Sequence, residues 1–560
     1  MFSSLPVVRI PSVRRFFAAT ALVTVGLTAW VSDLPDEGGI YGLSLIFAKL
    51  FIYQDRDALM VTLLLLLVLM LLPSLPDLRR VPIWLADHPW SVCIATTLTL
   101  CAGSVWVYHA HPLSMDEYAQ VFQSRVFASG HLTGVFPLPA INWLIPPWFQ
   151  GTFLRVSPVT GQVMSVYSPS FALVMTPFTW LGMPWACNAV LSGLTVVTLR
   201  KLALELFESK QAAGMAMLFT VASPVFFADG ISFYSMTAHL LFNSVFALLL
   251  TKTTAQRLLL AGVAGSVALT LHNPLPHTLF ALPWVAWLGL RKHGVRNLAF
   301  LAAGYLPLGI PLLLGWHHLS GSLASPGGEA ANTGLGSMVA PSLMSWPTYS
   351  IVLARCIGLV KVWIWAVPGL LLLAVAGAWR GRHDPRCLVL AASAVITFAG
   401  YFFFTPDQGH GWGYRYFHSA WFVLPLLAAG FFSPRTAVVE RSTASDGGAL
   451  TSFVVLASLS MLVVGVGMRA VQIDSYMRDH LAQLPDYHGK ELRIVLISQR
   501  ATSYGADLVQ NDPFLRGDVI RMFLQDPAGV PDAVRLLHPE FHRVYADRHG
   551  EVWSAARPTP

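Results

Sequence analysis

The chain has 560 residues, of which 55% are hydrophobic and only 12% are charged, and its mean hydropathy is +0.58. Soluble globular proteins contain about 25% charged residues, so this composition excludes a soluble multi-domain enzyme, a disordered scaffold and a coiled coil. Residues 1–471 carry 43 charged side chains, about 9%, whereas residues 472–560 carry 22, about 25%. The sequence therefore predicts a long membrane part and a short water-exposed tail.

The net charge of +7 and the pI near 9.2 fit basic loops on the cytoplasmic side of a membrane protein. The sequence has no clustered basic stripe, so it gives no indication of nucleic-acid binding. The five cysteines all fall in apolar stretches without metal-ligand spacing, which favours small buried side chains over ligands.

Thirteen segments are long and apolar enough to cross a membrane, which takes about 20 residues. They are 16–32, 58–75, 90–108, 185–206, 213–229, 231–251, 256–272, 276–291, 298–317, 355–379, 386–405, 417–433 and 450–470. Two further apolar segments, 40–53 and 168–183, are too short or too interrupted and are predicted to be interfacial or re-entrant. The sequence thus predicts an all-α polytopic membrane protein with about 13 transmembrane helices.

Lys and Arg concentrate on one set of flanks, eighteen against seven on the other. By the inside-positive rule, the N-terminus is cytoplasmic and the tail lies outside. Cytoplasmic loops are short, whereas the outside holds loop 109–167, the Gly/Ser/Ala-rich loop 318–348, loop 406–416 and the tail. The chemistry is therefore expected on the outer face.

The outer loop begins with a run of polar residues that includes Asp116 and Glu117. From residue 118 to 126 the apolar residues recur at helical spacing, with Gln120, Gln123 and Ser124 on the opposite, polar face, which predicts a helix lying on the membrane surface. Ser114 and Glu117 fit a capping box, in which Asp116 simply favours the positive end of the helix. The alternative is functional: an ionised Asp116 held at the surface accepts a proton from an acceptor hydroxyl or binds a divalent cation.

Other polar residues gather at predicted outer turns. His272 and His277 flank a short turn, where ionisable groups are either functional or interfacial. Asp229 and His239 flank another such turn. In the stretch before span 417–433, Arg415 breaks the inside-positive pattern.

Arg415 and Tyr416 suit a phosphate clamp with aromatic support, or else an interfacial anchor. His410 precedes them in the same loop. Arg355 and Lys361 start an apolar segment near the outer surface, and either snorkel to the interface or bind an anion. Carboxylates, imidazoles and an Arg on one face beside lipid suit an enzyme acting on a lipid-linked phosphate.

With these motifs in order, the sequence resembles the membrane glycosyltransferases of the GT-C fold, near protein O-mannosyltransferases and lipid A aminoarabinose transferases. The resemblance runs from about residue 90 to the C-terminus. It rests on Asp116-Glu117 after the first core span, Tyr167-Ser-Pro169-Ser-Phe171 through Leu181-Gly182, and Gly413-Tyr-Arg415-Tyr416 with Pro425 in the following span.

The resemblance implies an inverting transfer from a polyprenyl-phosphate sugar to an extracytoplasmic cell-envelope acceptor, which is a glycan, a lipid or a protein. Asp116 would be the base, and Glu117 would orient the acceptor or help to hold a metal. Arg415, Tyr416, His272 and His277 would bind the donor phosphate. Further candidate substrate contacts are Tyr167, Asp229, His239 and His410. Cofactors are none, or a divalent cation, Mg or Mn.

The same resemblance divides the chain into three parts. Residues 1–89 are extra N-terminal helices outside the core pattern, residues 90–471 are the GT-C-like catalytic core, and residues 472–560 are a small extracytoplasmic domain. It places the protein in the plasma (inner) membrane, with the lipid bilayer and the lipid-linked sugar as its partners.

The tail reads as a small α/β module. Segments 492–499 and 518–525 are predicted strands, 531–538 a helix and 543–554 a hairpin. It carries no nucleophile motif or phosphate loop. Two other functions remain open for the chain: a flippase or transporter of a lipid-linked glycan, and a glycan ligase or polymerase with a diphosphate-linked donor.

Overall fold

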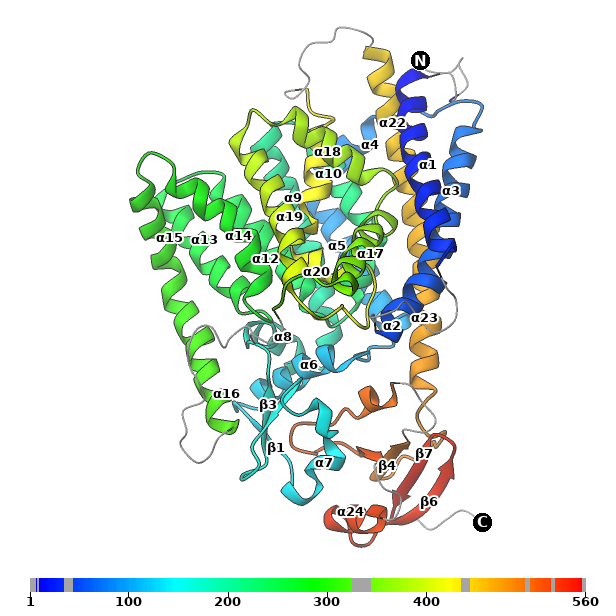
Figure 1. Ribbon diagram of the computed structural model, residues 1–560, viewed down its shortest axis with the longest axis vertical. Helices are drawn as coiled ribbons and strands as arrows, with labels where there is room; N and C mark the ends of the chain where they lie inside the picture. The colour runs from blue at the N-terminus through cyan, green and yellow to red at the C-terminus, as the bar shows by residue number, and fades with distance from the viewer. Residues whose placement is uncertain are drawn as a thin grey trace.

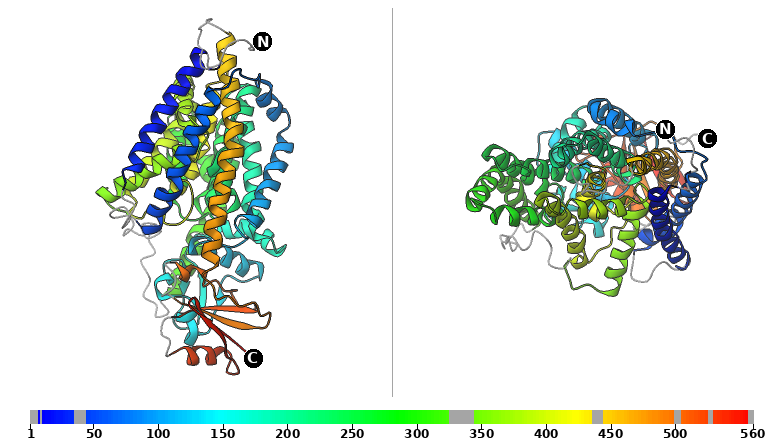
Figure 2. Two further views of the ribbon diagram at one scale, coloured as in Figure 1. Left: turned by 90° about the vertical axis from the view of Figure 1, so that its right-hand side faces the viewer. Right: turned by 90° about the horizontal axis from the view of Figure 1, so that it is seen from above.

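The computed structural model describes residues 7, 10–34, 44–324, 344–434, 444–498, 504–524 and 529–555. A tall helical body stands above a smaller lower part, in which the first outer loop meets the C-terminal domain (Figures 1 and 2). The N-terminus lies at the far end of the body and the C-terminus in the lower part. Most of the predicted loop 318–348 lies outside the described residues.

The helices of the body follow one another along the chain with short connections. They are α1 (Pro11–Ser32), α2 (Leu45–Lys49), α3 (Arg56–Met70), α4 (Arg80–Asp87), α5 (Pro89–Trp106), α8 (Ser170–Trp180), α9 (Cys187–Phe207), α10 (Lys210–Val221), α11 (Pro224–Ile231), α12 (Met236–Leu250), α13 (Ala255–Leu269), α14 (Leu275–Gly289), α15 (Gly294–Gly309), α16 (Trp316–Ala324), α17 (Tyr349–Ile364), α18 (Leu370–Arg380), α19 (Pro385–Gly400), α20 (Arg415–Trp421), α21 (Val423–Gly430), α22 (Ala444–Ser460) and α23 (Val466–Leu481).

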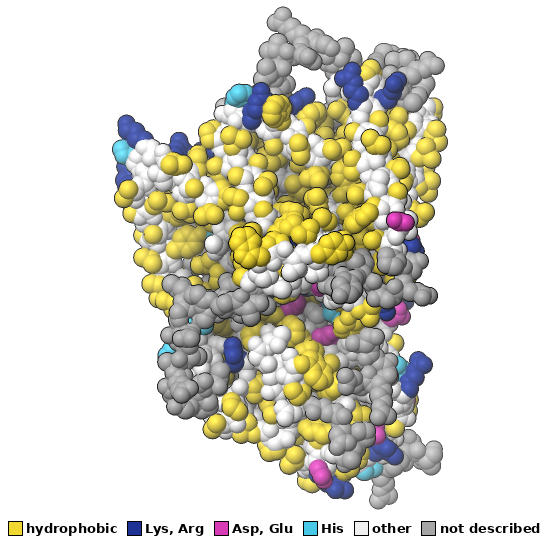
Figure 3. Space-filling model, viewed as in Figure 1, with side chains coloured by type: hydrophobic (Ala, Val, Ile, Leu, Met, Phe, Trp, Pro, Cys, Tyr) yellow, Lys and Arg dark blue, Asp and Glu magenta, His cyan; other side chains and the backbone are white. Residues whose placement is uncertain are grey.

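The prediction of thirteen crossings is not confirmed. Within the described ranges, five helices are long and apolar enough to span a bilayer, and a bent pair would make a sixth. The five are Pro11–Ser32, Pro89–Trp106, Gly294–Leu323, Pro385–Phe403 and Gly447–Leu481, and the bent pair is Lys210–Val221 with Pro224–Ile231, at 60°. Hydrophobic side chains cover the body, and Lys and Arg gather along its upper rim (Figure 3).

Two predicted segments have the wrong boundaries. The single crossing 355–379 is wrong because the helix breaks between α17 and α18. Pro368 has no amide hydrogen to donate, and Gly369 adopts a left-handed φ of +74°. The predicted interfacial segment 40–53 is not separate either, because α2 continues into α3 through a π-helical turn, Leu50–Asp55.

The N-terminal helices are fastened to the core by a buried ion cluster. Asp55 lies 2.6 Å from Lys361 Nζ and 2.8 Å from Arg469 Nη2, and all three residues are about 1% exposed. Trp365 Nε1 also donates to Asp55, at 2.7 Å. Lys361 therefore neither snorkels to the interface nor is free to bind an anion, because the Asp55 carboxylate already pairs with it.

Arg355 is likewise committed to the fold. Its guanidinium donates to the carbonyl oxygens of Tyr401, Phe404 and Pro406, at 2.7, 2.5 and 2.9 Å. It therefore fixes the chain that leads from α19 to the loop 406–416, which carries Arg415 at the end of the body that faces the lower part.

The lower part combines the outer loop with the tail. The outer loop contains α6 (Met115–Ala128), α7 (Ile141–Leu144) and a small sheet of order β1-β3-β2, with β1 (Gly134–Val135), β2 (Leu154–Val156) and β3 (Gln162–Ser165). The tail has a sheet of order β5-β4-β7-β6, in which only β4 and β5 are parallel. Its elements are β4 (Arg493–Ser498), β5 (Val519–Leu524), α24 (Val530–Leu537), β6 (His542–Asp547) and β7 (Gly550–Ser554), which confirms the predicted α/β module.

The outer loop and the tail share one hydrophobic core. Phe122 of α6 and Phe136 pack in the same buried cluster as Leu496 of β4 and Met522 of β5. This shared core holds the tail domain rigidly against the start of α6.

The water-exposed face predicted for α6 is wrong. Gln120, Gln123 and Ser124, expected on its wet face, are all at most 1% exposed. The Gln123 side chain is hydrogen-bonded to the protein instead of to water. It donates to the carbonyl oxygen of Leu132 and accepts from the amide of Ser165.

Candidate active site

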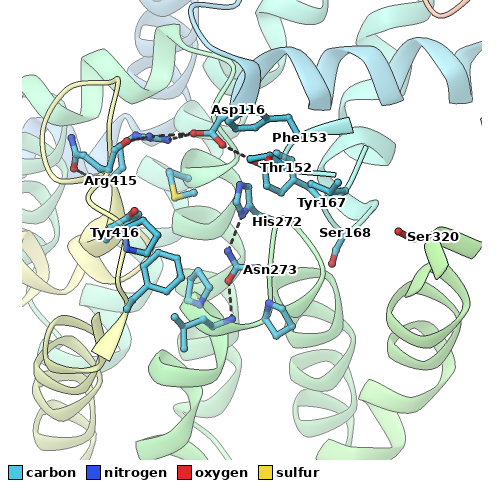
Figure 4. A pocket seen from close by; sticks show the side chains of 18 of the residues that line it. Asp116, Thr152, Phe153, Tyr167, Ser168, His272, Asn273, Ser320, Arg415 and Tyr416 are labelled. Carbon is cyan, nitrogen blue, oxygen red and sulfur yellow. Dashed lines mark hydrogen bonds and ion pairs between the residues drawn. The ribbon is translucent and has the colours of Figure 1, made fainter. Parts of the chain in front are cut away.

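Asp116 lies in the first turn of α6, at the junction between the helical body and the lower part (Figure 4). The Tyr167 hydroxyl donates to one of its carboxylate oxygens. The other oxygen lies 3.4 and 3.5 Å from the two terminal nitrogens of Arg415. These two partners come from segments about 50 and 300 residues away in the chain.

The chain before Asp116 is held by both neighbouring parts of the molecule. Ser114 Oγ lies 3.1 Å from the Tyr234 hydroxyl in the body. The amide of Met115 donates to Asp507 of the tail, at 3.2 Å. Hydrogen bonds to the helical body and to the tail therefore both hold the start of α6, which fixes the direction of the Asp116 side chain.

The predicted capping box is wrong. The Ser114 side chain makes no cap hydrogen bond, and Glu117 does not reach back to Ser114. Instead the fully buried Glu117 carboxylate accepts from the amides of Leu113 and Phe233, at 2.6 and 2.7 Å, and from the Tyr108 hydroxyl, at 2.9 Å. Glu117 thus joins α6 to two segments of the body.

The adjacent carboxylates have opposite pKa shifts. Burial raises the pKa of Glu117 to about 7, although its three hydrogen-bond donors oppose this. Burial also acts to raise the pKa of Asp116, but the Arg415 charge and the Tyr167 hydrogen bond outweigh it, so the Asp116 pKa lies below its usual value. Asp116 is therefore ionised at neutral pH, as a proton acceptor must be.

Arg415 is held by several contacts, but its Nε–H group has no hydrogen-bond partner. Its amide donates to Gln408 Oε1 at 3.1 Å, its terminal Nη2 donates to the Gln408 carbonyl, and the guanidinium lies 4.1 Å from the centre of the Tyr234 ring. Its Nε is buried without a hydrogen-bond partner. A buried N–H without a partner is costly, so this atom suits an oxygen of a bound anion.

Two aromatic contacts shape the same wall. The His272 ring stacks on Tyr167, with 4.0 Å between ring centres. Burial lowers the pKa of His272 to about 4, so its imidazole is neutral at pH 7 and acts through hydrogen bonds rather than charge. Tyr416 stacks on Tyr401, with 4.7 Å between centres, and its hydroxyl donates to the Asp407 carbonyl.

A first cavity, of about 480 Å³, opens on one side of Asp116. We call it the inner cavity. Its described lining includes two arginines, two aspartates and several polar, aromatic and apolar side chains. Among them are Arg155, Arg415, Asp116, Asp407, Tyr167, His272, Asn273, Leu313, Trp316, His317, Tyr401, Phe404, Gln408 and Tyr416. Arg155 Nε, like Arg415 Nε, is buried without a hydrogen-bond partner.

A second cavity, of about 490 Å³, lies on the other side of Asp116. We call it the outer cavity. It is lined by Ser114, Met115, Asp116, Trp148, Phe149, Phe153, Asp407, Gln408, Gly409, His410, Tyr504, Gly505, Ala506, Asp507 and Phe523. The two cavities share Asp116, Phe153, Asp407 and Gln408, so the carboxylate of Asp116 stands where they meet.

The predicted site residues divide into two groups. Six of them line a cavity: Asp116, Tyr167, His272, His410, Arg415 and Tyr416. The remaining four, Glu117, Asp229, His239 and His277, line neither cavity. Their predicted roles at the substrate stay predictions.

Three of these four are buried inside the helical body. His277 is 1% exposed and lies 2.7 Å from Asn243 Oδ1 and 2.5 Å from the Tyr305 hydroxyl. Asp229 lies 2.9 Å from His418. His239 is fully buried, and neither ring nitrogen has a hydrogen-bond partner.

Several lining residues were not predicted. Gln408 and Asp407 stand in the same Gly-rich stretch as Arg415, so the stretch could have indicated them. Trp148 and Arg155 come from the loop 109–167, where Arg155 is one of the seven Lys and Arg side chains outside the more basic flanks. Asp507 and its neighbours in the tail gave no signal, because nothing in the sequence indicated which tail residues face the body.

The chain's described residues include no group of three or more His, Cys, Asp or Glu side chains placed to hold a metal ion. At Asp116 both carboxylate oxygens already face protein donors. These residues therefore do not form a metal site by themselves, and both alternatives, no cofactor or a Mg or Mn ion, stay predictions.

Comparison with known proteins supports the fold. No family model matches the sequence, and no curated protein does. The structure of ArnT from Cupriavidus metallidurans bound to undecaprenyl phosphate is 14% identical, with a TM-score of 0.52, over 84% of this chain and 99% of that chain. Apo ArnT from the same organism is 14% identical, with a TM-score of 0.51, over 84% and 98%. The predicted resemblance is therefore confirmed at the level of the fold: the chain has an ArnT-like fold with a small C-terminal sheet domain.

Proposed function

We propose that the protein is a glycosyltransferase that moves a sugar from a polyprenyl-phosphate donor to an acceptor hydroxyl. The observation that carries this proposal is the position of Asp116, an ionised carboxylate at the meeting point of two cavities. A transfer reaction needs separate places for donor and acceptor with a proton acceptor between them.

The inner cavity suits the donor. Its two arginine side chains offer unpaired Nε–H groups to a phosphate, and Arg is well suited to phosphate oxygens. Leu313, Trp316 and Phe404 supply apolar lining beside these charges for the first part of a lipid chain. The related fold of ArnT, solved with undecaprenyl phosphate bound, supports a donor of this class.

The reaction follows from the placement of these groups. Asp116 takes the proton of the acceptor hydroxyl, and the freed oxygen attacks the anomeric carbon of the donor sugar. The bond from that carbon to the phosphate oxygen breaks, and the electron pair leaves with the polyprenyl phosphate. Arg415 stabilises the charge that collects on the leaving phosphate. One displacement of this kind inverts the anomeric configuration.

The proposed orientation puts the two cavities outside the cytoplasm, in the plasma (inner) membrane. It is supported by the Lys and Arg side chains at the rim opposite the tail (Figure 3), since positive loops remain cytoplasmic. Acceptors at that face belong to the cell envelope.

The test is a transfer assay with purified full-length protein, a panel of radiolabelled polyprenyl-phosphate sugars and membrane extract from the source cell. We expect labelled product and free polyprenyl phosphate from the unaltered protein. Asp116→Asn keeps the size of the side chain but removes the base, and we expect it to lower transfer by about 100-fold or more. Parallel assays with EDTA measure metal dependence.

Two outcomes would reject the proposal. Full activity in Asp116→Asn would remove the base assignment. If no donor released polyprenyl phosphate while intact labelled lipid crossed proteoliposome membranes, the protein would be a flippase instead.

A further inference from the structure

The outer cavity is built by three separate parts of the chain. The outer loop provides Trp148 and Phe149, the loop 406–416 provides His410, and the tail provides Tyr504 and Asp507. The tail therefore does more than cover the site, because its side chains form one wall of a cavity that reaches Asp116.

The two cavities differ in their charged side chains. Asp116, Asp407 and Asp507 line the outer cavity, and its described lining includes no Lys or Arg. The inner cavity shares Asp116 and Asp407 with the outer one but adds Arg155 and Arg415. A phosphate group is therefore more favourable in the inner cavity than in the outer one.

The outer cavity also has polar groups that are ready for a ligand. His410 is 8% exposed, its Nδ1 lies 3.2 Å from the Tyr476 hydroxyl, and its Nε2 has no hydrogen-bond partner. The nearest carboxylate oxygen, Asp507 Oδ2, lies 3.5 Å from that Nε2. A buried imidazole nitrogen without a partner, next to a carboxylate, matches the alternating donors and acceptors of neighbouring hydroxyl groups.

Aromatic rings complete the lining. Trp148 meets Phe523 edge to face, with 5.0 Å between ring centres, and is still 48% exposed. Tyr504 meets His410 in the same way, at 4.6 Å. Flat apolar ring faces next to hydrogen-bonding groups suit a sugar ring, which has an apolar C–H face and a rim of hydroxyls.

We propose that the outer cavity is the acceptor subsite and that it binds a sugar residue without phosphate, either neutral or bearing an amine. The acceptor role rests on the proposed glycosyltransferase function, whereas the sugar specificity rests on the lining alone. The tail domain is then part of acceptor recognition.

The experiment measures direct binding, without any donor. Full-length protein in nanodiscs, with polyprenyl phosphate added to saturation so that the inner cavity is occupied, is titrated with a neutral methyl glycoside, with its amino-sugar analogue, with the 6-phosphate of the neutral glycoside and with a Ser/Thr-containing peptide. Saturation-transfer NMR or calorimetry reports binding. We expect the first two probes to bind, and the phosphate to bind at least about tenfold more weakly.

Trp148→Ala removes one ring face, and we expect it to weaken glycoside binding about tenfold or more. Asp507→Asn keeps the oxygen that accepts from Met115 but removes the charge, so it should reduce preference for the amino sugar. Trp346→Ala is the matched control, since Trp346 is 84% exposed and lines neither cavity. Binding of fluorescent polyprenyl phosphate should remain unchanged in all three variants.

The outcomes separate this proposal from the previous one. Glycoside binding that Trp148→Ala leaves unchanged, equal binding of the phosphorylated probe, or peptide binding in place of glycoside binding would overturn the sugar assignment. If the glycosides bind as expected and no donor is consumed, the sugar site stands while the transferase function fails.

Discussion

The hydrogen bond from Tyr167 to Asp116 predicts a measurable shift in pH dependence. Tyr167→Phe removes the hydroxyl that donates to the carboxylate but leaves the ring stacked on His272, at 4.0 Å. The Trp316 indole, which donates to the Tyr167 main-chain oxygen at 2.8 Å, also remains in place. The variant therefore changes the proton affinity of Asp116 and little else.

The size of the shift follows from the strength of the bond. A hydrogen bond to a charged group contributes about 1.5–3 kcal/mol, and one pKa unit corresponds to about 1.4 kcal/mol. Full loss would raise the Asp116 pKa by about one to two units. Because the Asp116 side chain is 27% exposed, water replaces part of the lost bond, so the lower end, about one unit, is expected.

The assay is the pH profile of kcat/KM for the donor, whose acid limb reports the base in the free enzyme. The pKa of Asp116 is depressed, so the unaltered protein should keep its rate as the pH falls towards 5. In Tyr167→Phe the fall in rate should begin at a pH about one unit higher than in the unaltered protein. Tyr416→Phe is the control for the position of the acid limb, which should not move even if the rate falls, since the Tyr416 hydroxyl donates to the main-chain oxygen of Asp407 and not to Asp116. An identical acid limb in Tyr167→Phe and the unaltered protein would refute the assignment of Asp116 as the titrating base.

Three further substitutions test the rest of the framework. Arg415→Lys keeps the charge but loses the planar fork, so we expect a lower kcat/KM for the donor, by about tenfold or more, with expression unchanged; an unaltered value would contradict phosphate binding there. Asp55→Asn leaves two buried cations without their carboxylate and should cost about 3–5 kcal/mol, seen as a lower Tm in detergent, whereas the exposed Asp57→Asn should not lower it. The raised pKa of Glu117 stabilises the fold while the group is protonated, so the Tm should fall as pH rises from about 5 to 7.5, and Glu117→Gln should flatten that change. A Tm of the unaltered protein that rises over this range would be evidence against the Glu117 shift.

Part of the site could be predicted because its residues break local rules. Asp116 stands at a helix start just outside a span, and Arg415 is a positive charge on the less basic side of the membrane. Each is unusual for its place in a membrane protein, and the structure brings the two together, with 3.4 Å between side-chain atoms.

Other residues could not be sorted from the sequence, because burial decides what a polar group does. His277 looks as unusual as His272, but it is paired with Asn243 and Tyr305 inside the body. These two partners are about 30 residues from His277 in the chain, and no spacing rule predicts such pairs. Hydropathy averaging also hid the break at Pro368, since the flanking residues are apolar on both sides.

The tail lines the outer cavity, a contact that the sequence did not predict. Its sheet was predictable from alternating apolar residues, but its position depends on the core that it shares with α6. Through that core, Asp507 reaches the amide of Met115, one residue before Asp116. The same carboxylate lines the outer cavity, so in the proposed reaction one residue both holds the base in place and faces the acceptor. In that proposal the arginines of the inner cavity hold the donor phosphate on one side of Asp116, and the attacking hydroxyl comes from the tail side.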